Sequence, residues 1–156
     1  MKEEEVIILS KKCNFHAVKA SSLKLEASGR EYWRIIDADN NSMVLCYLNP
    51  SKGDHLNFIA ISEELIKNNI SCSKIVHHNK TLGVTIQHDL GDGDLLSILD
   101  EDNKNELLKS SLQMLSAIQN SSINNINKFT KEELLGQMNL FKDAFCRNFL
   151  NVNVNS

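Results

Sequence analysis

Residues 31–48, EYWRIIDADNNSMVLCYL, contain two short runs rich in β-branched and aromatic residues, separated by a polar break. The runs are Glu31–Ile36 and Met43–Leu48, and the acidic, asparagine-rich segment between them is typical of a turn. A third run, Ser22–Ala27, precedes them and is separated from Glu31 by Ser28-Gly29. This pattern predicts a three-stranded antiparallel meander.

The segments on either side extend this meander into a larger sheet. Residues 3–19 carry a loose apolar stripe behind an acidic first turn, which predicts a helix. After the meander, His55–Asn69 has apolar residues at helical spacing, and the short runs Ser73–His77 and Leu82–Gln87 read as two more strands. We therefore expect a five-stranded antiparallel sheet with one helix inserted after the third strand.

An acidic, glycine-containing connector, Asp89–Asp94, follows the last predicted strand and is the best candidate for a domain boundary. It divides the chain into residues 1–93 and residues 94–156, and the second part reads as helical throughout. Expected helical segments there are Leu95–Leu99, Glu106–Gln119 and a helix capped by Thr130, with Glu133 placed for a capping box.

The bulk composition excludes several classes of protein. The chain has 156 residues, a net charge of -3 and a pI of about 5.9, which argues against a nucleic-acid binder. Its four cysteines form no C-x-x-C pair, so neither a zinc site nor a disulfide framework is indicated. The chain also has no apolar run near the ~20 residues of a membrane span and no basic-then-apolar leader. A cytoplasmic protein without a membrane partner is the expectation.

The first predicted hairpin resembles that of a known family. Residues 26–34, EASGREYWR, are similar to the hairpin of the aminoglycoside phosphotransferase family, whose members have a kinase-like fold. The similarity is closest to the bacterial kinases that phosphorylate N-acetylmuramate and N-acetylglucosamine at the anomeric position. Matching residues are Ala27, Ser28, Arg30, Tyr32, Trp33 and Arg34, whereas Gly29 stands where that group has an aromatic residue.

Four later segments resemble the same group in the same order. Met43–Pro50 is similar to its third strand and proline loop, Phe58–Ile70 to its helix, Gln87–Asp92 to its hinge and Phe129–Leu150 to the helix before its catalytic loop. The resemblance implies an α+β fold with a protein-kinase-like N-lobe in residues 1–93. Residues 94–156 would then be the first helices of a truncated C-lobe.

The resemblance also implies a nucleotide site and its cofactors, ATP and Mg²⁺. A hairpin loop above the phosphates needs small residues, so that backbone amides can approach, and a positive charge. The hinge would offer backbone donors and acceptors to the adenine. The expected nucleotide-binding residues are Ser28, Gly29 and Arg30 in the hairpin, and Gln87, His88, Asp89 and Leu90 in the hinge.

The residues that would carry out kinase chemistry are missing. That chemistry needs an aspartate at the acceptor hydroxyl, and an asparagine and second aspartate that hold Mg²⁺. The chain contains no H-x-D motif, so we assign no catalytic residue and no metal ligand. Asp89-Leu90-Gly91 is interpreted as hinge rather than as a metal-binding triplet. Lys52 is interpreted as a solvated loop residue, and Glu63 as the edge of a helical stripe.

Two functions remain open from the sequence. The chain could be the ATP-binding part of an enzyme that phosphorylates a hydroxyl of a small sugar or aminoglycoside-like compound, and would then be inactive alone. Alternatively, it could be a non-catalytic binding module or a degenerate kinase-fold fragment. An aromatic helix face, Phe141, Phe145 and Phe149, could then meet a complementary C-terminal half or a second copy. Trp33 is expected in the core, and His77, His78 and His88 at strand ends.

Overall fold

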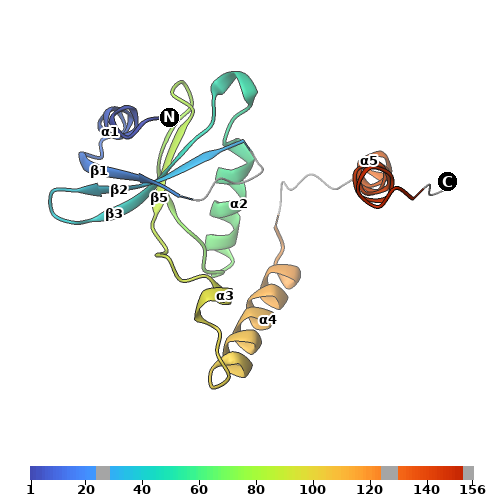
Figure 1. The fold of residues 1–156 in the computed structure, drawn as a ribbon. Helices are drawn as coiled ribbons and strands as arrows, with labels where there is room; N and C mark the ends of the chain where they lie inside the picture. The colour runs from blue at the N-terminus through green and yellow to red at the C-terminus, as the bar shows by residue number, and fades with distance from the viewer. Residues whose placement is uncertain (24–28, 124–129, 153–156) are drawn as a thin grey trace. The chain divides into compact units, whose positions relative to one another are not determined.

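The computed structural model describes residues 1–23, 29–123 and 130–152. The chain divides into two compact units, Met1–Asn124 and Asn125–Ser156, which are described separately here (Figure 1).

The first unit is built on a five-stranded antiparallel sheet with the strand order β1-β2-β3-β5-β4. Helix α2 lies between the third and fourth strands in the chain, which confirms the predicted arrangement of a helix after the third strand. The elements are α1 Glu3–Lys12, β1 Ala17–Ser22, β2 Glu31–Asp37, β3 Ser42–Tyr47, a 3-10 turn Pro50–Lys52, α2 Leu56–Lys67, β4 Ile75–Asn79 and β5 Val84–His88.

The N-terminal helix is shorter than the sequence predicted. It ends at Lys12 instead of residue 19, because Asn14 adopts a left-handed backbone conformation with φ of 61°. The amide of Phe15 then donates to the carbonyl of Ser10, which closes the helix end. The first strand therefore begins at Ala17 rather than Ser22, and residues 24–27 of the predicted strand lie outside the described residues.

One face of the sheet carries the hydrophobic core and is packed against α1. Val6 of α1 and the strand residues Ile35, Leu45 and Val84 are fully buried in this cluster. Trp33 is 8% exposed on the same face, so its predicted place in the core is confirmed. Because side chains alternate along a strand, the residues between these apolar positions project from the opposite face.

The remaining helices are α3 Leu95–Ile98 and α4 Lys104–Asn120 in the first unit, and α5 Lys131–Leu140 in the second, continued by a π-helical segment Phe141–Phe149. The capping box predicted at Thr130 is present, with its hydroxyl accepting from the amide of Glu133. No helix in the described part of the chain is long and apolar enough to cross a bilayer.

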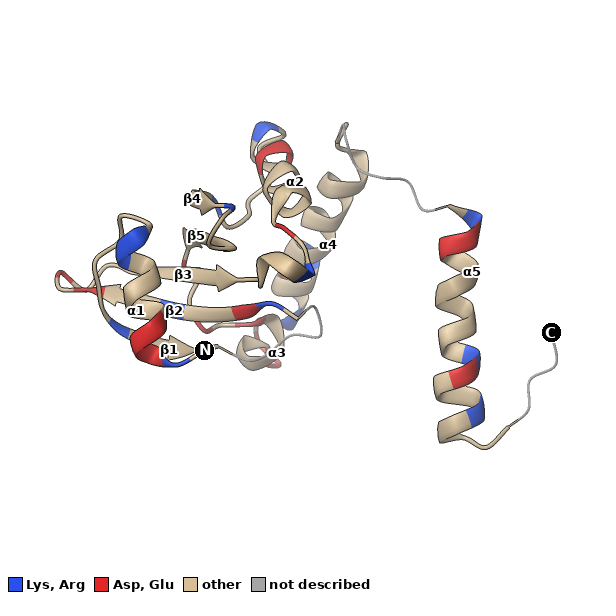
Figure 2. Cartoon of the chain, turned by 90° about the horizontal axis from the view of Figure 1, so that it is seen from above, with Lys and Arg blue, Asp and Glu red and all other residues tan. Residues whose placement is uncertain are grey.

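The apolar faces of α4 and of the second unit are exposed. Figure 2 shows that the middle of α5 carries no charged residue, and Phe141, Phe145 and Phe149 stack on one another with ring centroids 5.2 and 5.6 Å apart. Phe149 is 74% exposed. The aromatic face predicted from the sequence therefore exists.

Candidate functional site on the polar face of the sheet

A row of polar residues crosses the sheet on the face opposite the core. Tyr32 pairs with Cys46, Cys46 with Thr85, and Thr85 with His78, so the four side chains lie side by side on β2, β3, β5 and β4. Cys46 and Thr85 are fully buried. Burial raises the pKa of the Cys46 thiol, although hydrogen bonds with Tyr32 and Thr85 oppose this effect.

Polar residues continue along the same face on both sides of this row. Arg34 and Gln87 occupy the next row, where Val44 pairs with both of them. Arg30 precedes Tyr32 by two positions, and its charge helps to lower the pKa of the Cys46 thiol. The polar face thus extends over at least three rows of the sheet.

His55 places a third titratable ring, after Tyr32 and His78, against this face. It stands immediately before α2, is 1% exposed and packs edge-to-face on His78, with ring centroids 6.2 Å apart. Its Nε2 lies 3.0 Å from the carbonyl oxygen of Gly83, which can only accept, so Nε2 carries the proton. Burial lowers the pKa of His55; Gly83 raises it, while Arg30 and His78 lower it further. The ring is therefore neutral near pH 7.

The approach of His55 depends on a glycine. Gly83 has φ of +63°, and a Cβ added there would meet the carbonyl oxygen of Leu48 at 2.0 Å. Only glycine allows the β4–β5 turn to lie this close to Leu48. The carbonyl of Gly83 in this turn fixes the tautomer of His55.

Several buried polar atoms on this face have no hydrogen-bond partner. They are Arg30 Nε, His55 Nδ1, His78 Nε2 and Gln87 Oε1. Folded proteins leave only a few such atoms per hundred residues, because each costs about 1–3 kcal/mol. Trp33 Nε1 and His77 Nε2 are also unpartnered, but they belong to residues of the core face. Because most of these atoms lie on the polar face, that face is the candidate binding surface.

Arg34 ties the connector after β5 to this same face. Its guanidinium donates to both carboxylate oxygens of Asp89, with Nε–Oδ2 at 2.5 Å and Nη2–Oδ1 at 3.0 Å, and Nη1 donates to Asp92. Asp89 also accepts from the hydroxyl of Ser42 and from the amide of Gly91. Arg34 and these hydrogen bonds lower the pKa of Asp89 to about 2. The predicted hinge is thus anchored to the sheet.

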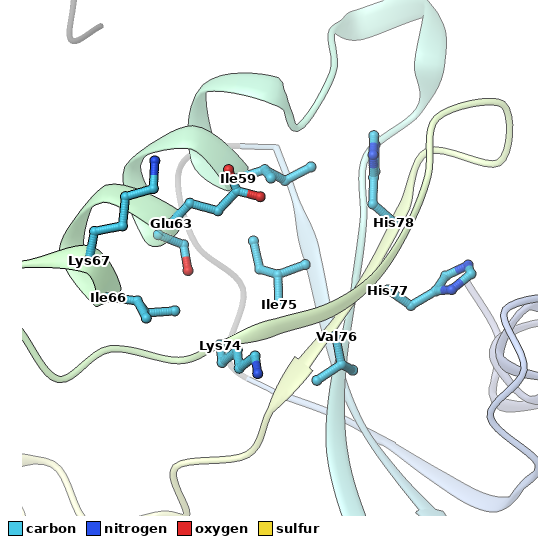
Figure 3. A pocket seen from close by; sticks show the side chains of 10 residues that line it. Ile59, Glu63, Ile66, Lys67, Lys74, Ile75, Val76, His77 and His78 are labelled. Atoms are coloured by element: carbon cyan, nitrogen blue, oxygen red, sulfur yellow. The ribbon is translucent and has the colours of Figure 1, made fainter. Parts of the chain in front are cut away.

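A cavity of about 390 Å³ opens between α2 and β4 at the edge of the sheet. Figure 3 shows Ile59, Glu63 and Ile66 of α2 facing Ile75 of β4, with His78 at one end of the cavity. Glu63 is exposed and lies at the margin of the helical stripe, in keeping with the structural interpretation of its sequence pattern.

The predicted nucleotide-binding residues fall at two ends of the polar face. Ser28 lies outside the described residues; Gly29 has φ of +70° and, with Arg30, precedes the Glu31 end of β2. Glu31 is in line with Tyr47 and Val84, whereas the hinge residue His88 pairs with Met43, opposite Ile35. Four residues at ~3.4 Å each separate these ends by about 14 Å.

Gly29 and Arg30 therefore lie near one end of this surface, and the hinge residues near the other. Gln87 contributes its side chain to the polar face and Asp89 is held by Arg34, whereas Leu90 is 74% exposed and His88 is also exposed. Lys52 is exposed in the 3-10 turn, as its interpretation as a solvated loop residue requires.

Sequence reasoning missed His55, and it assigned His78 only a strand-end position. Neither residue belongs to a recognisable motif. A signal was nevertheless present, because Tyr32 and Arg34 alternate with the apolar residues Trp33 and Ile35, and Thr85 and Gln87 alternate with Val84 and Ile86. Such alternation on neighbouring strands marks a sheet face that is not part of the hydrophobic core.

The described residues do not fit the Mg²⁺ that the resemblance implies. No group of three or more histidine, cysteine, aspartate or glutamate side chains that could hold a metal ion occurs in ranges 1–23, 29–123 and 130–152. Two carboxylates of the connector, Asp89 and Asp92, are paired with Arg34. No step involving a metal is therefore derived for this chain.

Comparisons of the sequence with protein-family models and with curated proteins found no match.

Proposed function

We propose that this chain is the nucleotide-binding part of a small-molecule phosphotransferase, with ATP bound along the polar face of the sheet. The observation that supports this most is the set of unpartnered buried polar atoms at Arg30, His55, His78 and Gln87. A ligand with a charged end and a second end that forms hydrogen bonds would provide partners for these atoms, and ATP, with its phosphates and its adenine, is such a ligand.

The positions of the two predicted segments define how the nucleotide would lie. Its base would be at the connector, where Arg34 and Ser42 hold Asp89 and thereby fix the backbone after β5. Its phosphates would be at the other end, near Arg30, whose charge is felt by both Cys46 and His55. The nucleotide would therefore extend lengthwise over about four residues of β2, or about 14 Å.

The acceptor in this proposal is a hydroxyl of a small sugar or aminoglycoside-like compound, as the resemblance of residues 26–34 implies. The sequence has no H-x-D motif, and the described residues form no group of three or more metal ligands, so in this proposal the chain binds nucleotide without transferring phosphate by itself. In this proposal a second polypeptide segment supplies the acceptor base and the metal ligands.

Nucleotide binding can be tested by isothermal titration calorimetry and thermal shift with ATP and with adenosine. We expect ATP to raise the melting temperature, because a ligand that binds only the folded state stabilises it. Arg30→Gln should weaken ATP binding roughly tenfold or more, since a charged hydrogen bond contributes about 1.5–3 kcal/mol, and should leave adenosine binding unchanged.

Lys52→Gln is the matched control, because it removes one exposed positive charge from the 3-10 turn without touching the polar face. It should change ATP affinity less than twofold. Absence of any stabilisation by millimolar ATP would refute the proposed function, as would equal effects of the two substitutions.

One observation favours a second candidate, a non-catalytic binding module. The stacked rings of Phe141, Phe145 and Phe149 are exposed, as are the apolar residues of α4. If the chain is a binding module, ATP will have no effect on its stability. Size-exclusion chromatography with light scattering will then detect an association of the wild-type chain, and removing the aromatic rings will abolish it.

A further inference from the structure

Two of the unpartnered groups that support the proposed function belong to histidines. His55 and His78 lie on different elements, in the loop before α2 and on β4, and their rings meet edge-to-face. Each keeps one ring nitrogen buried without a partner, Nδ1 in His55 and Nε2 in His78. Both lie at the Tyr47–Val84 end of the sheet, where Arg30 precedes β2.

Three titratable side chains act on the protonation of His55. Arg30 and His78 both disfavour its protonation, whereas the carbonyl of Gly83 and the carboxylate of Asp54 favour it. The carboxylate of Asp54 accepts from the amide of Leu56 in the first turn of α2 and is exposed. It is therefore oriented toward the helix, although its charge still favours protonation of His55.

The second ring faces a different set of charges. Glu63, Lys67 and Lys74 line the cavity that His78 also borders, so one carboxylate and two ammonium groups lie on that side. Lys67 is paired with Glu64 on α2. With Lys67 paired, the charges of Arg30 and Lys74 are matched by those of Asp54 and Glu63. An anion is favoured over a cation because the unpartnered Nε of Arg30 can only donate a hydrogen bond.

We propose that Arg30, His55 and His78 form a subsite for a phosphoryl anion, in which anion binding is accompanied by uptake of one proton on His55. This inference rests on the proposed function, in that the anion is the phosphate end of the nucleotide. The ligand class is a phosphate or polyphosphate, and it approaches between the half-buried residues Arg30, Tyr32 and His78.

The proton uptake follows from the tautomer of His55. Because Nε2–H donates to the carbonyl of Gly83, neutral His55 presents only a lone pair at Nδ1, which repels an anion. A proton added at Nδ1 converts it into a donor. Burial holds the pKa of the free ring below 6.5, and a bound anion raises it.

The sign of the pH dependence follows because the pKa of His55 is lower in the free protein than in the complex. Protons are taken up between the lower pKa of the free ring and the higher pKa of the complex. Affinity for the anion therefore falls as the pH rises through that window, by at most tenfold per pH unit for a single proton. Below the window both states are protonated and affinity is independent of this group.

The test uses inorganic pyrophosphate as the probe and calorimetry of the full chain at pH 6.5. Titrations in two buffers that differ in ionisation enthalpy should give a net uptake of between zero and one proton per pyrophosphate bound. His55→Gln keeps an amide N–H for the Gly83 carbonyl but cannot titrate, so the uptake should disappear. His78→Gln should lower pyrophosphate affinity roughly tenfold.

His77→Gln is the matched control. His77 also has a buried, unpartnered Nε2, but it pairs with Ile86 and projects from the core face instead. It should change pyrophosphate affinity less than twofold. Zero proton uptake by the wild-type chain would overturn the inference, and so would equal effects of the substitutions at residues 77 and 78.

Adenosine separates this inference from the proposed function. If adenosine and ATP bind but pyrophosphate binding does not depend on His55 or His78, the histidine subsite is refuted and the nucleotide function stands. If pyrophosphate binds with proton uptake while ATP binds no more tightly and adenosine does not bind, the anion subsite stands and the nucleotide function is refuted.

Discussion

Replacing Asp89 by asparagine tests whether the connector is held to the sheet as the structure indicates. The carboxylate is 10% exposed, accepts two hydrogen bonds from Arg34 and one each from Ser42 and Gly91, and has a pKa of about 2 against an ordinary value of 3.8. At about 1.4 kcal/mol per pKa unit, the ionised form contributes about 2 kcal/mol of folding stability. Asp89→Asn should therefore lower the free energy of unfolding by about 2 kcal/mol at pH 7.

The pH dependence gives the prediction a sign. Because the pKa is lower in the folded state, the contribution is complete above the unfolded pKa of 3.8 and is lost as the pH falls toward 2. The difference between wild type and variant should shrink to about half by pH 3. Urea denaturation gives the free energy of unfolding at each pH. It can be followed by the fluorescence of Trp33, the single tryptophan, which lies on the same strand as Arg34.

Asp92→Asn is the matched control. Asp92 binds the same guanidinium, but its side chain is 81% exposed, so the change should cost less than about 1 kcal/mol. A loss below about 0.5 kcal/mol for Asp89→Asn at pH 7, or a loss that does not diminish at pH 3, would show that the ion pair does not stabilise the folded state as argued.

Three further changes probe other parts of the fold. Gly83→Ala should destabilise the first unit by several kcal/mol, because its Cβ would meet the Leu48 carbonyl oxygen at 2.0 Å; thermal unfolding should show a large drop in melting temperature, and a drop of only a degree or two would contradict the geometry. Ile35→Val should cost about 1 kcal/mol, since Ile35 is fully buried, whereas Ile61→Val on the exposed side of α2 should cost almost nothing; urea titrations giving equal costs would argue against the described core. Thr130→Ala should remove about 1 kcal/mol of stability from α5 and lower the helical circular dichroism signal, and Thr130→Ser should retain that signal.

Much of the local structure was determined by the sequence because its signals are short-range. The polar break between Glu31–Ile36 and Met43–Leu48 fixes a hairpin, and Thr130 followed by Glu133 fixes a helix start, since both act within a few residues. The five strands and the helix after the third were predicted for the same reason. The position predicted for the first strand was wrong, because the left-handed conformation of Asn14, which ends α1, has no reliable sequence signature.

Only the tertiary structure decided which polar residues meet. Arg34 and Asp89 are 55 residues apart in sequence, and their ion pair depends on the register of β2, β3 and β5. His55 and His78 meet for an equivalent reason, since the turn at Gly83 brings a carbonyl to the loop before α2. Sequence alone determines which segments become strands, because that depends on neighbouring residues; strand order and register depend on the packing of the whole sheet, and they place the charges.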